Sequence, residues 1–272
     1  MHAIPFNPIQ PVKRIMKIEQ VAVQLYTLRN HLKTPADMAK TLKRVREIGY
    51  RAVQMSGVGP IDPLEFSKMC QGEGLTLCAT HESSDDILRN PEAIVSRMKA
   101  LGCTLTAYPY PRGIDFGSEE GVNQLIADLT HAGTVLRDAG ITLCYHNHNL
   151  EYRKLNGTVI MHRIYDEIPA DVLGAELDTY WVQMGGADVV DEIDRVAGRQ
   201  PILHLKDCGV DDDNKTVFCE IGNGNLPWKR IIAAAEKGGT EWFAVEQDTC
   251  PGDEFDSVKQ SFDYIAANLV EG

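Results

Sequence analysis

One pattern recurs along the chain: a polar, helix-forming segment, then a glycine, then a short apolar run. It is seen in "REIGYRAVQM", "KALGCTLTAY", "RDAGITLCYH" and "EKGGTEWFAVE", among other stretches. A glycine just past a helix accepts the left-handed backbone conformation that ends it. An apolar run of about five residues without strict alternation is typical of a strand buried on both faces. The pattern therefore predicts helices that alternate with buried strands.

Counting from the start of the chain, the pattern predicts eight strands, at residues 20–25, 51–55, 75–80, 103–108, 141–147, 172–178, 201–206 and 242–247. It predicts eight helices, at residues 35–48, 63–72, 91–101, 119–139, 158–168, 187–197, 227–237 and 255–269. Eight strand–helix units in series indicate an α/β protein with a closed (β/α)8 TIM barrel. A doubly wound open sheet is the alternative, but no glycine-rich phosphate loop follows the first strand. We expect one barrel domain at 18–272 behind an irregular N-terminal arm at 1–17.

Composition narrows the function classes. Apolar residues make up 43% of the 272 residues and charged residues 24%, which is ordinary for a soluble globular protein. The net charge of −12 disfavours nucleic acid as a partner, because an acidic surface repels phosphates. No stretch has the length of a membrane span, and the N-terminus does not resemble a secretory signal. The seven cysteines include no CxxC pair, so we expect free thiols and a cytoplasmic location.

In a TIM barrel the active site is built at the C-terminal ends of the strands. The first four predicted strands end close to Tyr26, Gln54, His81 and Tyr108. A small-molecule carbohydrate needs hydrogen-bonding groups and an aromatic surface, so we predict that these four residues line the substrate pocket. The alternative for the tyrosines is that they only pack the rim of the barrel.

The last four strands end in ionisable side chains, most densely in "CYHNHNLEY". The residues concerned are His146, His148, Glu151, Asp178, His204 and Glu246. A charged group at the end of a buried strand is costly unless it is paired, hydrogen-bonded or bound to a metal. Mixed imidazole and carboxylate ligands suit one divalent metal, for which we expect Mn²⁺, with Zn²⁺, Co²⁺, Fe²⁺ or Mg²⁺ as alternatives. Taken singly, Asp178 could cap a helix, His204 could be a core histidine and Glu246 could pair with Lys206.

"YHNHNLEY", "ELDTYWV", "HLKD" and "AVEQD", in this order, resemble the xylose isomerase-like barrel superfamily. That group includes sugar phosphate isomerase/epimerase enzymes, ketose 3-epimerases and inosose dehydratases. The resemblance implies a metal held by Glu, Asp, His and Glu from the last four strands. Asp178, His204 and Glu246 match the last three of these ligands. His146 stands where ketose epimerases have their glutamate, and Glu151 follows five residues later, so both are candidate first ligands.

The resemblance also suggests roles in catalysis. His148 becomes the candidate base for proton transfer, and Glu246 matches one of the two metal-bound glutamates that move the proton in epimerases. Lys206 could polarise a substrate oxygen, or neutralise Asp207 or Glu246. The histidine in place of the first glutamate resembles the inosose-dehydratase and keto-glycoside-processing branches, and it puts a two-carboxylate epimerisation in doubt.

Three functions follow as hypotheses. The first is a metal-dependent isomerase or epimerase of a sugar or keto-sugar, which removes a proton α to a carbonyl. The second is a lyase or dehydratase that acts on a keto-inositol or a 3-keto-glycoside. The third is a noncatalytic sugar-binding barrel. A homo-oligomer is compatible with each of these.

Overall fold

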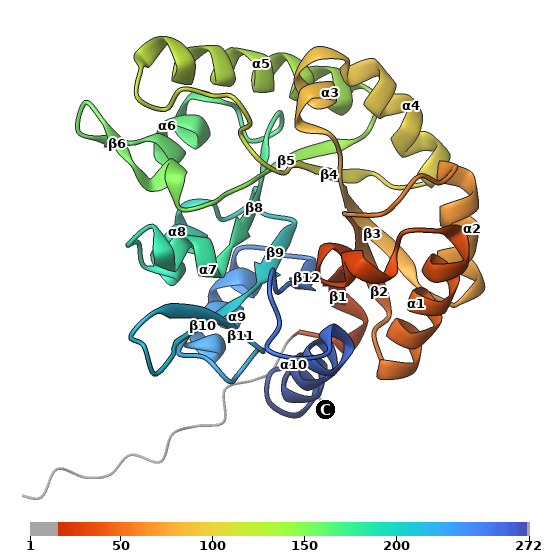
Figure 1. The fold of residues 1–272 in the computed structure, drawn as a ribbon. Coiled ribbons are helices and arrows are strands. Elements are labelled where there is room, and N and C mark those ends of the chain that lie inside the picture. The colour runs from red at the N-terminus through yellow and green to blue at the C-terminus, as the bar shows by residue number, and fades with distance from the viewer. Residues whose placement is uncertain (1–15, 271–272) are drawn as a thin grey trace, which may run out of the picture.

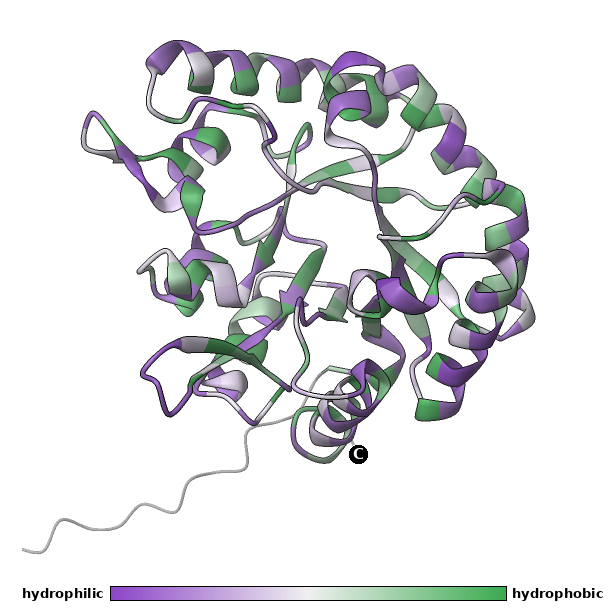
Figure 2. Cartoon of the chain, in the orientation of Figure 1, coloured by the Kyte–Doolittle hydropathy of each residue, from purple (hydrophilic) through white to green (hydrophobic). Residues whose placement is uncertain are grey.

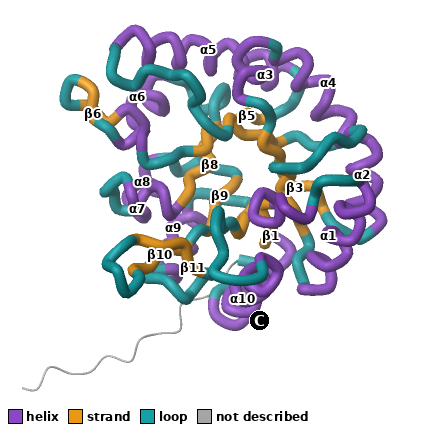
Figure 3. The backbone as a smooth tube through the Cα atoms, in the orientation of Figure 1, coloured by secondary structure: helices purple, strands orange, loops and turns teal. Residues whose placement is uncertain are grey.

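The computed structural model describes residues 16–270, so nearly all of the predicted arm at 1–17 lies outside the described residues. Eight parallel strands form a closed barrel, in which β1 pairs with both β2 and β12. The barrel strands are β1 (Val21–Gln24), β2 (Ala52–Met55), β3 (Thr76–His81), β4 (Leu105–Tyr108), β5 (Thr142–His146), β8 (Gly174–Asp178), β9 (Ile202–Leu205) and β12 (Trp242–Val245). Each corresponds to a predicted strand, and the predicted (β/α)8 barrel is confirmed (Figures 1 and 3).

The predicted helices form a ring around the strands (Figure 3). They are α1 (Pro35–Ile48), α2 (Pro63–Gly72), α4 (Pro91–Leu101), α5 (Glu119–Asp138), α6 (Ile160–Glu167), α8 (Val189–Arg195), α9 (Trp228–Lys237) and α10 (Glu254–Asn268). The recurring glycines end helices as predicted: Gly102 after α4 has φ 67° and Gly140 after α5 has φ 78°. Such positive φ values are favourable for glycine because it lacks a Cβ.

Several short elements were not predicted. They are two helices, α3 (Ser84–Arg89) and α7 (Thr179–Met184), three 3-10 segments, η1 (Ile18–Gln20), η2 (Leu25–His31) and η3 (Leu150–Tyr152), and two hairpins, β6 (Lys154–Leu155) with β7 (Thr158–Val159) and β10 (Asp207–Val210) with β11 (Thr216–Cys219). All except η1 lie in segments that follow the C-terminal ends of barrel strands, where such folds place their sites. No helix within residues 16–270 combines the length and apolar character that a membrane crossing requires.

The core has two layers. Large apolar side chains fill the space between the strands and the helices, and polar and apolar residues alternate along the outer helices (Figure 2). Inside the barrel, the buried cluster consists mainly of small residues: Ala22, Ala52, Cys78, Ala79, Leu105, Ala107, Cys144, Ile202 and Ala244. Small interior side chains leave room for the longer polar side chains that follow them along the strands.

Candidate metal centre and active site

The two-residue period of the strands determines which side chains point into the barrel and form the site. Side chains at i and i+2 face the same side of a strand, so an interior residue fixes the direction of the one two positions later. The interior residues Ala52, Ile202 and Ala244 are followed in this way by Gln54, His204 and, just past the end of β12, Glu246. The barrel therefore carries a layer of buried polar side chains directly above its small apolar interior.

Glu176 lies at the centre of this layer. It is fully buried on β8, two residues before Asp178. Its Oε1 atom contacts Nε2 of His81 at hydrogen-bond distance and lies 3.0 Å from Nε2 of His204 and 3.2 Å from Nδ1 of His146. Its Oε2 atom accepts a hydrogen bond of 2.7 Å from the side chain of Gln54. Sequence analysis missed Glu176 because it considered the last residues of each strand and not the position two residues earlier.

The charge of Glu176 is stabilised by the surrounding rings. Burial alone would raise the pKa of this carboxyl, but His204 and His81 hold the pKa well below its usual range. Burial alone would lower the pKa of His204, but Glu176 and Glu246 raise the pKa to about 10. In the metal-free protein His204 is therefore an imidazolium between two carboxylates.

A second group of side chains, the rim group, lies at the C-terminal ends of the barrel strands. His146, Asp178, His204 and Glu246 each offer one ligand atom, and these four atoms all lie within 4.8 Å of one another. Nδ1 of His204 lies 2.8 Å from Oε2 of Glu246 and 3.9 Å from Oδ2 of Asp178. His146, His81, Glu176 and His204 meet the same distance criterion. The structure thus brings four of the five predicted metal ligands together.

Asp178 has the capping role weighed from the sequence and also leaves one carboxylate oxygen without a hydrogen-bond donor among residues 16–270. Its Oδ1 atom caps α7 by accepting a hydrogen bond of 3.0 Å from the backbone N–H of Trp181. Within residues 16–270, no group donates a hydrogen bond to its buried Oδ2 atom. Burial raises the pKa of Asp178 to about 7, against the opposing effect of Lys206. A buried carboxylate oxygen without a donor, close to an imidazole nitrogen and a second carboxylate, fits a divalent cation well.

Lys206 follows β9 and is buried among carboxylates. Its Nζ atom lies 2.7 Å from Asp248 Oδ2 and 3.4 Å from both Asp178 Oδ2 and Glu246 Oε2. Burial alone would lower the pKa of Lys206, but these three carboxylates raise it above the usual range. Lys206 is therefore a permanent cation beside the rim group, and it is ion-paired with Asp178, Glu246 and Asp248. Asp207 instead accepts hydrogen bonds from the loop before α9.

His148 and Glu151 are joined in the loop after β5. Oε2 of Glu151 accepts a 2.9 Å hydrogen bond from the backbone N–H of His148, and Oε1 accepts a 3.0 Å hydrogen bond from the Tyr145 hydroxyl. Burial raises the pKa of Glu151 to about 7. Glu151 belongs to neither of the two ligand groups found among residues 16–270. The structure thus binds Glu151 to the loop and to Tyr145, and it places His146, its alternative as first ligand, in both groups.

The His148 ring lies above this loop, between aromatic side chains. Its centroid is 4.9 Å from that of Tyr110 and 5.3 Å from that of Trp181. Burial lowers the pKa of His148 to about 2, so the ring is neutral. Its buried Nδ1 atom has no hydrogen-bond partner in the described part of the chain. Trp181 in turn packs edge-to-face against Phe218 of β11. We call the aromatic side chains on this side of the site, Tyr110, Trp181 and Phe218, the aromatic wall.

The four predicted substrate contacts lie in different places. Gln54 and His81 belong to the buried polar layer, and their polar groups bind other side chains: Gln54 binds Glu176 and His204, and His81 binds Gln24 and Glu176. Tyr26 is 38% exposed and stacks on Arg29. Tyr108 does not belong to this layer. Because Ala107 faces inward, Tyr108 faces the helices and packs on Tyr145.

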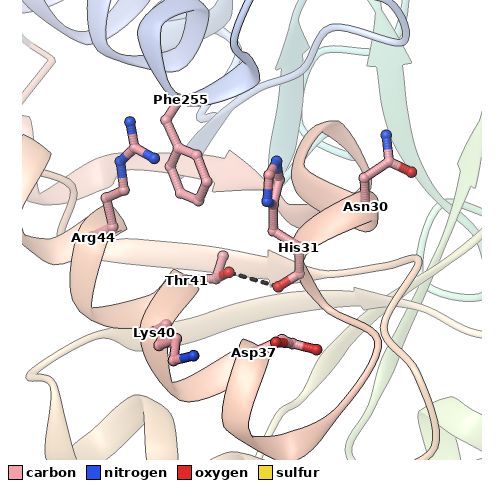
Figure 4. Close-up of a pocket in the computed structure, with 7 residues that line it drawn as sticks. All are labelled: Asn30, His31, Asp37, Lys40, Thr41, Arg44 and Phe255. Carbon is pink, nitrogen blue, oxygen red and sulfur yellow. Dashed lines mark hydrogen bonds between the residues drawn. The ribbon is translucent and has the colours of Figure 1, made fainter.

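A separate pocket of about 300 Å³ lies outside the barrel, between η2, α1 and α10 (Figure 4). Its polar groups mostly bind one another or their neighbours. Thr41 donates to the carbonyl of His31, the His31 ring contacts Glu254, and Arg44 stacks on Phe255. This pocket offers no buried polar group in need of a ligand, so the candidate site is the one inside the barrel.

Comparisons with known proteins agree with the barrel fold. The model of a family described as xylose isomerase-like TIM barrel matches residues 42–267. A sugar phosphate isomerase/epimerase from Parabacteroides distasonis has a TM-score of 0.80 at 21% identity, over 98% of this chain and 100% of that chain. An L-ribulose 3-epimerase structure has a TM-score of 0.70 at 17% identity, over 92% and 94%.

A xylose isomerase-like TIM barrel protein from Mycobacterium smegmatis, in complex with magnesium, has a TM-score of 0.71 at 15% identity, over 92% of this chain and 96% of that one. At these identities the structural likeness shows the shared fold. A sequence search of curated proteins found no match.

Proposed function

Because the chain belongs to the xylose isomerase-like TIM barrel family, we propose that it is a divalent-metal-dependent isomerase or epimerase of a sugar or keto-sugar. The observation that carries the proposal is the rim group. Oδ2 of Asp178 is buried without a donor among residues 16–270, and it lies 3.9 Å from Nδ1 of His204 in a group completed by His146 and Glu246. We propose these four residues as the metal ligands.

A bound divalent cation would stabilise negative charge that develops on a substrate carbonyl oxygen. His148 is the proposed base for the proton α to that carbonyl. Its unpartnered Nδ1 supports this role, because a base needs a lone pair that no other donor occupies. The lowered pKa of the ring opposes the role, because it makes His148 a weak base in the metal-free protein. Glu246 is the proposed second proton carrier at the opposite edge of the site. Lys206, held as an ammonium by Asp178, Glu246 and Asp248, is proposed to donate a hydrogen bond to a substrate oxygen.

We also propose side chains that contact the substrate. Tyr26 and the aromatic wall of Tyr110, Trp181 and Phe218 offer exposed or half-buried rings on which a sugar face could stack. Gln54 and His81 would act on the substrate indirectly: Gln54 through His204 and Glu176, and His81 through Glu176.

A lyase that acts on a keto-inositol or 3-keto-glycoside is the second candidate. The observation that favours it is His146, which occupies the strand position where ketose epimerases have a glutamate. With an imidazole there, Glu246 and Asp178 are the only carboxylates in the rim group formed by the described residues. Proton removal by neutral His148 followed by loss of a β-substituent needs only one base.

Solvent exchange distinguishes these reactions. Mn²⁺-loaded protein is incubated in deuterium oxide with unphosphorylated ketoses, including L-ribulose and D-fructose, and with 2-keto-myo-inositol. An isomeric sugar that carries deuterium next to its carbonyl supports the isomerase or epimerase, and loss of water from the keto-inositol supports the lyase.

Asp178→Asn and His204→Gln should each abolish this exchange, because each removes a proposed ligand. Glu192→Gln is the matched control, since Glu192 is also buried and bound to a histidine, His162, but outside the barrel. Full exchange in both ligand variants would contradict the proposal. Tight sugar binding without any exchange would favour the noncatalytic barrel.

A further inference from the structure

The hydrogen-bond partners of His81 determine where its proton lies. Nδ1 of His81 is 3.4 Å from the amide nitrogen of Gln24, which can only donate, so Nδ1 accepts. The proton is therefore on Nε2, which faces Oε1 of Glu176. A carboxylate can only accept, and the two contacts are consistent with one tautomer.

The same reasoning applies to His204. Its Nε2 atom lies 2.7 Å from Oε1 of Gln54 and 3.0 Å from Oε1 of Glu176, and both of these atoms are acceptors. The Gln54 orientation is fixed in turn, because its amide nitrogen donates to Oε2 of Glu176. Nε2 of His204 therefore carries a proton. Its other nitrogen, Nδ1, is the one that faces Glu246 and Asp178.

His146 is the third ring at Glu176. Its Nδ1 atom lies 3.2 Å from Oε1 of Glu176 but makes no hydrogen bond within the described part of the chain, so this contact does not fix the position of the His146 proton. One carboxylate oxygen thus lies within 3.2 Å of nitrogens from three rings. That oxygen occupies the space between the rings where a cation shared by them would have to lie. The arrangement fits a hydrogen-bond acceptor better than a second metal ligand.

We propose that Glu176 is a positioning residue that orients the histidine ligand His204: together with Gln54, whose amide it fixes, it holds the proton on Nε2 of His204 and so presents Nδ1 of His204 to the metal. This inference rests on the proposed function, since it assumes a metal in the rim group. A carboxylate that binds the outer nitrogen of a metal-bound histidine fixes the tautomer and strengthens the ligand. Gln54 and His81, bound to the same carboxylate, hold Glu176 in place.

Zn²⁺ is the probe, because a diamagnetic ion allows both calorimetry and nuclear magnetic resonance of the histidine rings. Zn²⁺ affinity is measured by calorimetry for the wild type, Glu176→Gln, Glu176→Leu and the control Glu192→Gln. Loss of such a partner typically weakens metal binding by about 10- to 100-fold. We expect a loss in this range for both Glu176 variants and wild-type affinity for Glu192→Gln. Circular dichroism of each metal-free variant checks that the barrel is folded.

A double variant provides the rescue. Glu176→Gln leaves an amide opposite the amide of Gln54, and Gln54→Glu restores a donor–acceptor pair and an acceptor for Nε2 of His204. We expect the double variant Gln54→Glu/Glu176→Gln to bind Zn²⁺ more tightly than Glu176→Gln alone. A merely destabilised barrel would not recover in this way.

Nitrogen-15 spectra of the histidine rings read the tautomers directly. In the Zn²⁺-loaded wild type we expect a proton on Nε2 of His204, with this assignment lost in Glu176→Leu. In the metal-free protein we expect the His81 proton on Nε2, and this assignment tests the contact between His81 and Glu176 without any metal. Unchanged Zn²⁺ affinity and tautomers in Glu176→Leu, or a proton on Nδ1 of His81, would overturn the inference.

Stoichiometry separates the remaining outcomes. Two Zn²⁺ ions per wild-type chain, falling to one in Glu176→Leu, would overturn the positioning role and make Glu176 a ligand. A wild type that binds no Zn²⁺ contradicts the proposed function, and the His81 tautomer still tests whether Glu176 controls the ring.

Discussion

Nζ of Lys206 lies 3.4 Å from Oδ2 of Asp178, although both side chains are almost completely buried. The same ammonium lies 3.4 Å from Oε2 of Glu246, so it neutralises two of the proposed metal ligands. A cation at this distance stabilises the metal-free site and competes electrostatically with a divalent metal.

Lys206→Met should therefore separate stability from metal affinity. Removal of one partner from a buried ion pair costs about 3–5 kcal/mol, so we expect a loss of this size in the free energy of unfolding of the metal-free protein. Mn²⁺ should bind about tenfold more tightly, since a competing charge is gone. Urea unfolding and calorimetry measure the two effects. Lys215→Met, at an exposed ion pair with Asp213, is the control. Weaker Mn²⁺ binding in Lys206→Met would contradict the prediction.

Glu151 should make stability depend on pH. Burial raises its pKa from the ordinary 4.5 to about 7 in the folded protein. Between these two values the folded state binds the proton and the unfolded state does not, so stability falls as pH rises from about 4.5 to 7. The loss amounts to about 3 kcal/mol, at 1.36 kcal/mol per pKa unit.

Glu151→Gln should remove this contribution. Urea unfolding of both proteins at pH 5 and pH 7.5, with a chelator present, measures the difference. We expect the wild type to lose stability relative to the variant at the higher pH. Equal pH dependence of the free energy of unfolding in the two proteins would contradict a raised pKa for Glu151.

The His148→Gln variant should bind the metal as the wild type does but lose most of its solvent-exchange activity. Among residues 16–270, Nδ1 of His148 has no partner, and the ring is not in either ligand group. We expect unchanged Mn²⁺ affinity and a drop of about 100-fold or more in solvent exchange into a turned-over sugar, the usual contribution of a general base. Exchange at the wild-type rate would assign proton removal to another group.

Asp207 should affect folding and leave the metal site intact. Its carboxylate accepts hydrogen bonds from the backbone N–H groups of Gly222, Gly224 and Leu226 and from the indole of Trp228. In Asp207→Asn an NH2 group would face some of these donors, and we expect a loss of about 2–4 kcal/mol in the free energy of unfolding. Mn²⁺ stoichiometry should stay the same. Asp213→Asn, exposed near the tip of the β10–β11 hairpin, is the control.

The barrel could be predicted from sequence because its signals are local. A helix, a glycine with positive φ such as Gly102 or Gly140, and a buried apolar run each follow from a few adjacent residues. The hairpins and short helices after the strands could not, because two- to seven-residue elements depend on contacts such as those of Asp207 with the loop before α9.

The site could be predicted from sequence only for those residues that lie at the ends of strands. Asp178, His204 and Glu246 were found because each lies at or beside the end of a strand. Glu176 was not, since its role depends on three rings from other strands. The two-residue strand period offers a signal that would have found it, because Glu176 shares the inward face with Asp178. The same period would have placed Tyr108 on the outer face, next to inward Ala107.

The metal content of protein purified without chelators tests the central claim most directly. Elemental analysis would compare the wild type with His146→Ala and Glu151→Ala. His146 is in the rim group, and both carboxylate oxygens of Glu151 accept hydrogen bonds from the loop and from Tyr145. We predict about one divalent metal per wild-type chain, lost in His146→Ala and retained in folded Glu151→Ala. A wild type that holds no metal even after soaking with Mn²⁺, or a metal lost only in Glu151→Ala, would contradict the account.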